Sequence, residues 1–583
     1  MVTSLRDIPG ARPGPGPRRR RRPRPSAGTY RPALLSDPRA ALDRGPSRRR
    51  QLFRAKRRPD VFLLVLCLGA IGLVAYVANA AWGANQVDLR LAGVADGSSL
   101  TLVTAGEIEL DIRVAPATRA NVTRAWVNGR EVTDELEERD HGFGWRPEEQ
   151  LAEGTYTIEV AVPRTFVGTS RQQRRFVVDG TAPQISAPAL LDPVAIDDPV
   201  VIEGHVDPDS VLLADGERVE HDEGRFALHY DIPPAGPVAL AAIDRSGNVA
   251  MSEVIVPVQH PGMRAAHVTA AAWAHDGLRQ GVLDMIDEGR IDTVQLDLKD
   301  EGGEIGYDSQ VPLARKIGAV KARYDLEEAL EDLHGRGVSV VGRMVAFRDP
   351  ILAKAAWEQG SPDWVIQTPD GDPHPSYGES FTNFAHPEVR QYNIDIALEA
   401  AAAGVDDILW DYIRRPEGSL DDMVAPGLID PPEVAVADFL AEAFPQLRAM
   451  GVYQGASVFG IAAARPGPVA QDMPRIARQT DYVAPMVYPS LWVSGEYRVP
   501  DPVGMPREIV RASLLDFQEK VDGTGTAIFP WLQDFSFRRV YGPAEVRAQI
   551  CGAAEIGIDG WLMWSPRVRY SAAGMDPGGT PSC

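Results

Sequence analysis

The sequence has very little cysteine. Three residues, Cys67, Cys551 and Cys583, occur in a chain of 583. So few cysteines argue against a fold held by a disulfide framework, and none of their spacings is that of a zinc or redox site. The segment "DLKDEGGE", residues 297–304, is rich in oxygen ligands but lacks the spacing of a calcium loop. We therefore predict no metal and no other cofactor.

Basic residues are scarce outside the N-terminus. Residues 1–59 carry 17 Arg and one Lys against three acidic residues, a charge of +15, whereas the whole chain carries −21. Residues 60–583 therefore carry −36. The opposite charges indicate two different environments, and the length suggests roughly three to four folded units.

A single long apolar run without charge separates these two parts. It reads "VFLLVLCLGAIGLVAYVANAAW", residues 61–82, and is long enough to cross a hydrocarbon core of about 30 Å as a helix. We predict a transmembrane helix over residues 60–83. Because the neighbouring Arg and Lys residues all precede the run, we expect a single-pass protein of the cell membrane, with a cytoplasmic N-terminus and extracytoplasmic C-terminal domains.

A cleaved signal peptide and a buried helix are the alternatives to an anchor. The run exceeds the core of about 7–15 residues that signal peptides have, and the basic region before it is longer than theirs. Small residues in "ANAAWGA", residues 78–84, could still serve a peptidase.

The tail, residues 1–59, is rich in Pro, Gly and Arg and has too few apolar residues to fold, so we expect it to be disordered. An arginine run can bind nucleic acid or lie on anionic lipid headgroups. Its position next to a membrane helix favours the lipid, and we expect no nucleic-acid partner.

Residues 86–258 have the pattern of all-β domains. Short alternating runs such as "GTYTIEVAV" and "VVIEGHV" are separated by Gly, Pro and Asp turns. We predict two small sandwiches, over residues 86–181 and 182–259. The segments "VDGTAPQI" and "AIDRSGNVA" resemble the junctions and hairpins of bacterial immunoglobulin-like repeats, which implies spacer modules or modules that bind sugar or protein.

Strands and helices alternate after His260, which is the pattern of a parallel sheet. Eight strand–helix units over residues 264–575 fit a TIM-type (β/α)8 barrel with an enlarged loop at 413–435. The predicted strands are 267–274, 293–300, 339–347, 407–412, 453–463, 481–490, 526–535 and 560–566.

The active site of such a barrel forms at the C-terminal ends of its strands. In this sequence carboxylates, bases and aromatic residues gather there. Hydrolysis of a glycosidic bond needs two carboxyl groups, and aromatic rings contact the apolar faces of sugars. The predicted substrate-binding residues are Asp297, Lys299, Asp300, Arg343, Tyr412, Arg414, Tyr488, Trp531, Gln533 and Trp564. Of these, Asp297, Lys299 and Asp300 could instead supply a second acid, or form only surface ion pairs.

Asp411 and Asp534 are the predicted catalytic residues. Asp411 ends an apolar strand, and a neighbouring Arg suits a nucleophile or base; the alternative is a structural acid paired with Arg414 or Arg415. Asp534 ends a strand three positions further round the barrel. Trp531 nearby would raise the pKa of a proton donor, whereas a loop-capping role is the alternative.

Six ordered blocks between residues 266 and 570 resemble a bacterial barrel family known as the "putative glycoside hydrolase domain". They include "LDLKDEGGEIGY", "VGRMVAFRDPILA", "DDILWDYIRRP", "DYVAPMVYPSLWVSGEY", "PWLQDF" and "GIDGWLMWSP". The resemblance implies a barrel related to glycosidases. Two positions depart from the family's pattern. "KDEGG" stands for "KDD-S-G", and Arg415 in "DYIRRP" replaces a Phe, which would favour an anionic substrate.

These observations predict a membrane-anchored, extracytoplasmic glycoside hydrolase. It would cleave a cell-wall or extracellular polysaccharide with two carboxyl groups, while the β-sandwiches hold the barrel away from the membrane. The alternatives are a non-catalytic carbohydrate-binding protein and an envelope assembly factor that works through its β domains. The expected partners are a polysaccharide and, through the N-terminal helix, the membrane.

Overall fold

The computed structural model describes residues 61–140, 142–579 and 583. The chain divides into two compact units, Met1–Gly83 and Ala84–Cys583. The predicted disordered tail, residues 1–59, lies outside the described residues.

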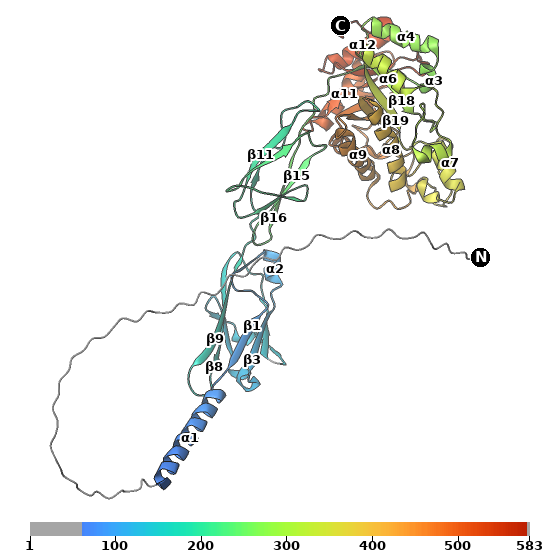
Figure 1. The fold of residues 1–583 in the computed structure, drawn as a ribbon. Helices are drawn as coiled ribbons and strands as arrows, with labels where there is room; N and C mark the ends of the chain where they lie inside the picture. Colours follow the sequence, from blue (N-terminus) through green and yellow to red (C-terminus); the bar gives the residue numbers. More distant parts are fainter. Residues whose placement is uncertain (1–60, 141, 580–582) are drawn as a thin grey trace, which may run out of the picture. The chain divides into compact units, whose positions relative to one another are not determined.

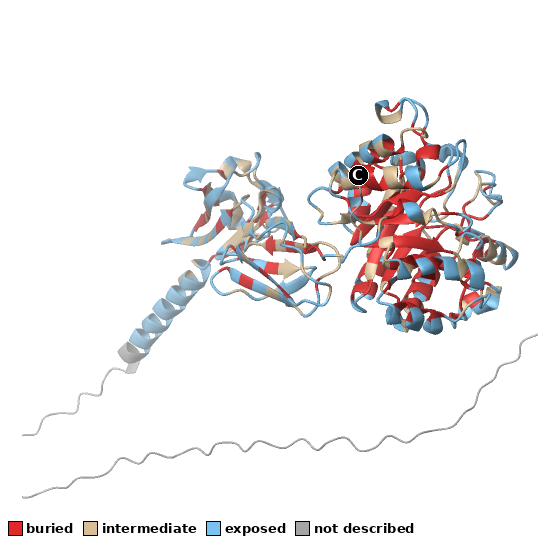
Figure 2. Cartoon of the chain, turned by 90° about the horizontal axis from the view of Figure 1, so that it is seen from above, coloured by how far each residue is buried: buried red, intermediate tan, exposed pale blue. Residues whose placement is uncertain are grey.

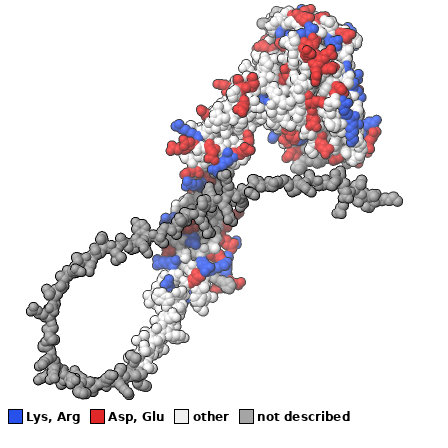
Figure 3. Space-filling view, in the orientation of Figure 1, with Lys and Arg blue, Asp and Glu red and all other residues white. Residues whose placement is uncertain are grey.

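The helix α1, Val61–Ala84, makes up the described part of the first unit and continues into the first residue of the second. Its residues 65–84 have a mean hydropathy of 1.9 and are long and apolar enough to cross a membrane. None of this segment is buried (Figure 2), and no charged side chain interrupts it (Figure 3). The predicted apolar helix is therefore confirmed, with bounds one residue later than the predicted 60–83.

Two sheets form the β module that follows α1 (Figure 1). Their strand orders are β1 (Asp88–Ala92), β3 (Leu110–Ala115), β7 (Gly142–Trp145) and β6 (Glu137–Arg139) in one, and β2 (Ser98–Leu100), β9 (Thr169–Val178), β8 (Gly154–Pro163), β4 (Arg124–Val127) and β5 (Arg130–Glu131) in the other. Alternate side chains of β3 are buried, namely Leu110, Ile112 and Val114, as expected of strands with one face on a core.

A second β module has the same two-sheet architecture. Its strand orders are β10 (Ile185–Ser186), β11 (Val200–Val206) and β14 (Arg225–Tyr230), and β13 (Glu217–Val219), β12 (Val211–Ala214), β15 (Val238–Ile243) and β16 (Val249–Val254). The turn between β15 and β16 is the predicted hairpin, in which Asp244 Oδ1 accepts hydrogen bonds from the backbone N–H groups of Ser246, Gly247 and Asn248. The predicted all-β architecture is confirmed, while the limits 86–181 and 182–259 remain predictions.

Eight parallel strand positions close into a barrel in chain order, as predicted. The strands are β17 (Arg264–Val268), β18 (Thr293–Lys299), β19 (Ser339–Val345), β20 (Asp407–Asp411), β21 (Tyr453–Phe459), β22 (Tyr482–Met486), β23 (Ala527–Ile528) with β24 (Trp531–Gln533) as one position, and β25 (Trp561–Trp564). Hydrogen bonds between β25 and β17 complete the circle.

Helices surround the barrel strands (Figure 1). They are α3 (Ala270–Trp273), α4 (Asp276–Asp287), α5 (Pro312–Ile317), α6 (Leu326–Gly335), α7 (Pro350–Glu358), α8 (Pro387–Ala403), α9 (Pro432–Arg448), α10 (Met473–Ala477), α11 (Pro506–Val521) and α12 (Pro543–Ala554). Local signals start and stop them. Asp325 caps α6 by accepting a hydrogen bond from the N–H of Glu328, and Gly404 ends α8 with a left-handed φ of 109°.

The first barrel strand lies earlier in the sequence than predicted. Residues 267–274 were expected to be a strand, but β17 ends at Val268 and residues 270–273 form the short helix α3. Thr269 causes the change, because its side chain accepts a hydrogen bond from the N–H of Ala272 and caps the helix. The alanine-rich run "AAAW" then follows as helix.

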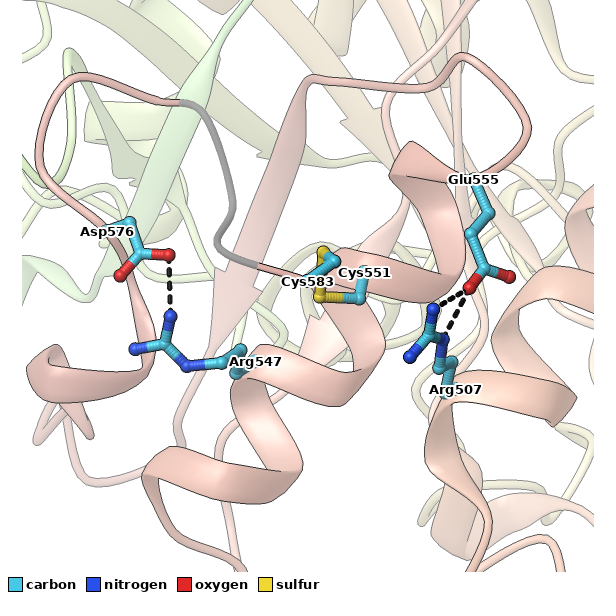
Figure 4. Close-up of a disulfide and its surroundings, with 6 residues drawn as sticks. All are labelled: Arg507, Arg547, Cys551, Glu555, Asp576 and Cys583. Atoms are coloured by element: carbon cyan, nitrogen blue, oxygen red, sulfur yellow. Dashed lines mark hydrogen bonds and ion pairs between the residues drawn. A yellow bond between two sulfur atoms is a disulfide. The ribbon is translucent and has the colours of Figure 1, made fainter.

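A disulfide joins Cys551, in α12, to Cys583 (Figure 4). The sequence prediction missed this bond, because the two residues lie 32 positions apart and only the fold brings their Cα atoms to 5.7 Å. Two ion pairs flank it, between Arg547 and Asp576 at 2.6 Å and between Arg507 of α11 and Glu555 at the end of α12.

Candidate active site

Arg343, near the end of β19, is the centre of an ion-pair cluster at the C-terminal ends of the strands, here called the barrel mouth. Its Nε and Nη2 atoms donate to Asp411 Oδ2 at 2.9 and 2.6 Å. Its Nη1 atom donates to Asp297 Oδ1 at 2.9 Å and to Glu301 Oε2 at 3.3 Å. One guanidinium group therefore orders three carboxylates, from β20, from β18 and from the loop after β18.

Asp297 is held from two sides. His267, near the end of β17, lies with its Nε2 atom 3.0 Å from Asp297 Oδ1, the same oxygen that Arg343 contacts. Asp297 Oδ2 is buried and has no hydrogen-bond partner in the described part of the chain. Burial alone would raise the pKa of Asp297, but the charges and hydrogen bonds of His267 and Arg343 outweigh it and lower that pKa. The structure thus provides a carboxylate with one oxygen still available as an acceptor.

Asp411 is 4% exposed, and both of its oxygens accept hydrogen bonds. Besides the two bonds from Arg343, the backbone N–H of Tyr412 donates to Asp411 Oδ1 at 2.7 Å. Tyr412 has a left-handed φ of 52°, which is unusual for an aromatic residue. Its hydroxyl accepts a hydrogen bond from Arg348 at 2.9 Å. Strained backbone beside a carboxylate at a strand end is a feature of functional sites.

Asp534, directly after β24, has a different environment. Its Oδ2 atom accepts a hydrogen bond from the N–H of Ser571 at 2.5 Å, and its Oδ1 atom accepts one from the hydroxyl of Ser571 at 2.8 Å. Burial raises the pKa of Asp534 although both bonds from Ser571 oppose the rise. This carboxyl group therefore takes up a proton more readily than an ordinary aspartate.

Tyr570 relates Asp534 to Asp297. Its hydroxyl donates to the carbonyl of His267, at the end of β17. Burial raises the pKa of Tyr570, and the negative charges of Asp534 and then of Asp297 raise it further. The charges of both carboxyl groups therefore affect the pKa of one tyrosine. Asp297 belongs to β18 and Asp534 follows β24, and β17 and β25 lie between these two strands.

Three aromatic rings gather beside the mouth. The Tyr488 and Trp564 rings have centroids 5.3 Å apart, and Phe535 lies 5.8 Å from Tyr488 and 5.1 Å from Trp564. Trp564 and Phe535 are half-buried, so part of each ring is accessible. Trp531 lies deeper, inside the barrel, where its Nε1–H donates to the hydroxyl of Ser457 at 3.0 Å. The structure brings two of the predicted aromatic residues, Tyr488 and Trp564, into one group and leaves Trp531 beneath the mouth.

Lys299 does not reach the mouth, contrary to its predicted role in binding. It is 0% exposed and forms an ion pair of 2.8 Å with Asp349, while its Nζ atom donates to Asn393 of α8 at 2.8 Å. The reason is local. The register between β18 and β19 shifts between Asp297 and Lys299, so the alternation that would direct both side chains inward is broken.

Asp300, Gln533 and Arg414 were also predicted to bind substrate, and each has polar atoms that form hydrogen bonds within the protein. Asp300 Oδ1 accepts hydrogen bonds from its own loop, from the N–H groups of Gly302 and Glu304. The side chain of Gln533 is fully buried, with its amide oxygen bonded to the N–H and hydroxyl of Ser490.

Arg414 and Arg415 stabilise the loop that follows β20. Arg414 is buried over the rings of Tyr412 and Phe459, at 4.7 and 4.4 Å. Arg415 donates to the backbone carbonyls of Pro416, Gly418 and Gly467. The donors of Arg415 are thus directed at backbone carbonyls of loop residues, and its preference for an anionic substrate stays a prediction.

Five residues at or beside the mouth were missed in the sequence: His267, Glu301, Phe535, Tyr570 and Ser571. His267 and Glu301 could have been found, since they lie at or just after strands whose ends point to the mouth. Glu301 keeps 47% of its side chain exposed, and burial is outweighed by the Arg343 charge, which lowers its pKa. Ser571 gave no signal, because it follows the last strand by several residues. In residues 61–140, 142–579 and 583, no three His, Cys, Asp or Glu side chains are arranged to hold a metal ion.

Comparison with known families gives one match. Residues 265–570, slightly more than half of the chain, match the family model described as "Putative glycosyl hydrolase domain". The comparison with curated proteins found no match.

Several solved structures match parts of this chain. The PgaB (BpsB) glycoside hydrolase domain from Bordetella bronchiseptica is 14% identical, with 54% of this chain and 99% of that chain covered and a TM-score of 0.39. A hypothetical protein from Ruminiclostridium thermocellum is 29% identical over 33% of this chain and 96% of its own, with a TM-score of 0.29. Fibronectin(III)-like modules of CbhA from Clostridium thermocellum are 12% identical over 30% of this chain and 97% of their own, with a TM-score of 0.21.

Proposed function

We propose that this chain, which belongs to the putative glycosyl hydrolase domain family, is a membrane-anchored glycoside hydrolase that cleaves an extracytoplasmic or cell-wall polysaccharide. The observation that carries the proposal is the contrast between carboxyl groups at one end of the barrel. Asp297 and Asp411 are ion-paired with Arg343, and His267 and Arg343 lower the pKa of Asp297, whereas burial raises the pKa of Asp534. Environments that separate the pKa values of paired carboxyl groups are how glycosidases divide acid and base roles.

Asp534 is the proposed proton donor. A general acid must hold its proton near the working pH, and the raised pKa of this group serves that purpose. It would protonate the glycosidic oxygen as the bond to the sugar ring breaks, and the leaving group would depart as an alcohol.

Asp411 is the proposed nucleophile or base, in agreement with the sequence prediction, and Asp297 is the second choice. Both carboxylates are paired with Arg343, which suits a group that must be negatively charged. Asp297 Oδ2 favours the second choice, because it is the oxygen without a partner in the described residues. The carboxylate that reacts would either attack the anomeric carbon or remove a proton from the attacking water.

Tyr488 and Trp564 are proposed to contact the sugar, together with Phe535. The half-buried rings of Trp564 and Phe535 would cover the C–H faces of a pyranose and leave its hydroxyl groups to polar side chains, while Tyr488, 5% exposed, packs against both rings. Arg343 and Glu301 are the polar groups of the mouth that could meet those hydroxyls.

The location outside the cytoplasm is supported by two independent features. The helix α1 is apolar and uncharged, and the Cys551–Cys583 disulfide is of the kind that persists in oxidising compartments. Retention of the full-length protein in carbonate-washed membranes would support an anchor. A released protein whose N-terminus begins near residue 82 would instead identify a cleaved signal peptide.

The activity can be tested with the full-length protein in detergent micelles. It is incubated with purified envelope glycans, and new reducing ends are counted for the wild type and for Asp534→Asn, Asp411→Asn and Asp297→Asn. We expect Asp534→Asn to lose most of the activity and one of the other two to lose it as well. Asp559→Asn is the matched control, since this exposed residue precedes β25 at the opposite end of the barrel.

A carbohydrate-binding barrel without catalysis is the second candidate. The observation in its favour is the low accessibility of the central carboxylates, since Asp297 is 1% exposed and both oxygens of Asp411 are bonded. Binding of the glycans without new reducing ends would support it against the enzyme. An assembly factor would instead lose its function on deletion of residues 86–258 and be unaffected by Asp411→Asn.

A further inference from the structure

One residue, Ser571, forms hydrogen bonds to both oxygens of the Asp534 carboxyl group. Its backbone N–H donates to Oδ2 at 2.5 Å and its hydroxyl donates to Oδ1 at 2.8 Å. Asp534 is 6% exposed, so its orientation is set by these bonds and by packing. A carboxylate has about four acceptor sites, and two bonds from one residue therefore fix its plane without using all of its capacity.

The backbone on both sides of Ser571 is itself fixed. Before it, the hydroxyl of Tyr570 donates to the carbonyl of His267. After it, Arg290 Nη1 donates to the carbonyls of Ala572 at 2.9 Å and Met575 at 2.5 Å. Ser571 is therefore held between the end of β17 and the loop that leads into β18.

The rest of the C-terminal segment is attached to α12. Arg547 of α12 donates to the carbonyl of Ala573 at 2.8 Å and pairs with Asp576. Figure 4 shows this ion pair and the Cys551–Cys583 disulfide along the same helix. Side chains of α12 thus secure the segment that carries Ser571.

We propose that Ser571 is a positioning residue for the reaction, which orients the Asp534 carboxyl group and serves both of its protonation states. This inference rests on the proposed function, in which Asp534 is the proton donor. A hydroxyl group can donate to an ionised carboxylate and accept from a protonated one, because its hydrogen rotates. A proton donor that is later re-protonated needs such a partner in both halves of the cycle.

The proposal makes a directional statement about pH. The groups that act on Asp534 are the surrounding burial and the two bonds from Ser571, and Tyr570 is the titratable neighbour. Bonds to the ionised form lower the pKa of a carboxyl group. Removal of the Ser571 hydroxyl takes away one of the two bonds that lower the pKa of Asp534. The pKa-raising effect of burial then meets less opposition, so the pKa of Asp534 rises further.

The test compares Ser571→Ala with Ser565→Ala. Ser565 lies in the same connection and is buried, but its hydroxyl donates to the carbonyl of Arg569 at 2.9 Å and not to a carboxyl group. The pH profile of kcat/KM is measured with purified envelope glycans and full-length protein. We expect the alkaline limb of Ser571→Ala to move up by about one pH unit, with Ser565→Ala unchanged and Ser571→Thr close to wild type. An unshifted limb in Ser571→Ala, or an equal shift in Ser565→Ala, would overturn the proposal.

A second measurement is independent of activity. If Ser571 acts on Asp534, the melting temperature of Ser571→Ala should fall more steeply than that of the wild type as the pH rises from acid to neutral, because a raised folded-state pKa stabilises the fold only while the group is protonated. This additional slope should vanish when Asp534→Asn is also present. If the additional slope persisted in the Asp534→Asn background, Ser571 would affect the stability through a group other than Asp534. A wild-type protein that hydrolyses no glycan would refute the proposed function, while the melting comparison would still decide whether the two residues are coupled.

Discussion

Arg343 donates two hydrogen bonds to a single oxygen of Asp411, from Nε at 2.9 Å and from Nη2 at 2.6 Å. Both groups are nearly inaccessible to solvent, and the remaining amino group of the guanidinium contacts Asp297. The pair therefore joins the ends of three neighbouring strands, β18, β19 and β20, and determines where negative charge lies at the barrel mouth.

Arg343→Lys is expected to reduce the activity by about 100-fold, because a point charge cannot reproduce the fork that orders three carboxylates. The same change should destabilise the fold, since part of the buried negative charge loses its partner. Initial rates of glycan hydrolysis measure the loss of activity, and urea unfolding measures the loss of stability. Arg507→Lys is the control, because its pair with Glu555 is partly exposed and should contribute at most about 1 kcal/mol. Wild-type rates in Arg343→Lys would remove the cluster from the reaction.

Lys299→Met should destabilise the protein by roughly 3–5 kcal/mol, because it leaves Asp349 buried and unpaired. The activity per folded molecule should stay near that of the wild type, since Lys299 lies between the sheet and α8. Unfolding curves and rates at low temperature separate the two quantities. A large loss of kcat in fully folded Lys299→Met protein would contradict this prediction and indicate that Lys299 takes part in substrate binding or catalysis. Lys354→Met, an exposed change on α7, is the control.

Asp297 should make the stability sensitive to acid. Its pKa is lowered in the folded protein, so its contribution is present above the unfolded-state pKa of about 3.9 and is lost as the pH falls through the folded-state value. Asp297→Asn should therefore show a smaller loss of melting temperature between neutral and strongly acidic pH than the wild type. An unchanged acid slope would contradict this assignment, and Asp559→Asn provides the baseline.

Breaking the Cys551–Cys583 bond is expected to cost about 3–4 kcal/mol, from the entropy of a loop of 32 residues in the unfolded chain. Cys551→Ser and wild-type protein in reductant should unfold at similarly lowered urea concentrations. Cys67→Ser is the matched control, because this residue lies in α1 and forms no disulfide. Equal stability of Cys551→Ser and wild type would mean that the ion pairs and hydrogen bonds of α12 suffice to hold the C-terminal segment.

The barrel itself could be predicted from the sequence to a large extent. Seven of the eight strand positions lie where the alternating pattern predicted them. The exception is the first strand, β17, which ends early because Thr269 caps a short helix in the apolar run that follows. The site was harder. Strand ends identify which residues can reach the mouth, but one register shift at β18 was enough to remove Lys299 from it.

The sequence by itself determined the apolar helix, the all-β modules, the barrel and the gathering of carboxyl and aromatic residues at one end. These follow from local periodicity, and periodicity is written in neighbouring residues. Only the tertiary structure decided which partner each group has. It paired Asp411 with Arg343, directed Arg415 to backbone carbonyls, and brought Ser571 to Asp534 and Cys583 to Cys551. These contacts join positions far apart in the chain or depend on side-chain direction. Local sequence periodicity specifies neither long-range pairing nor side-chain direction.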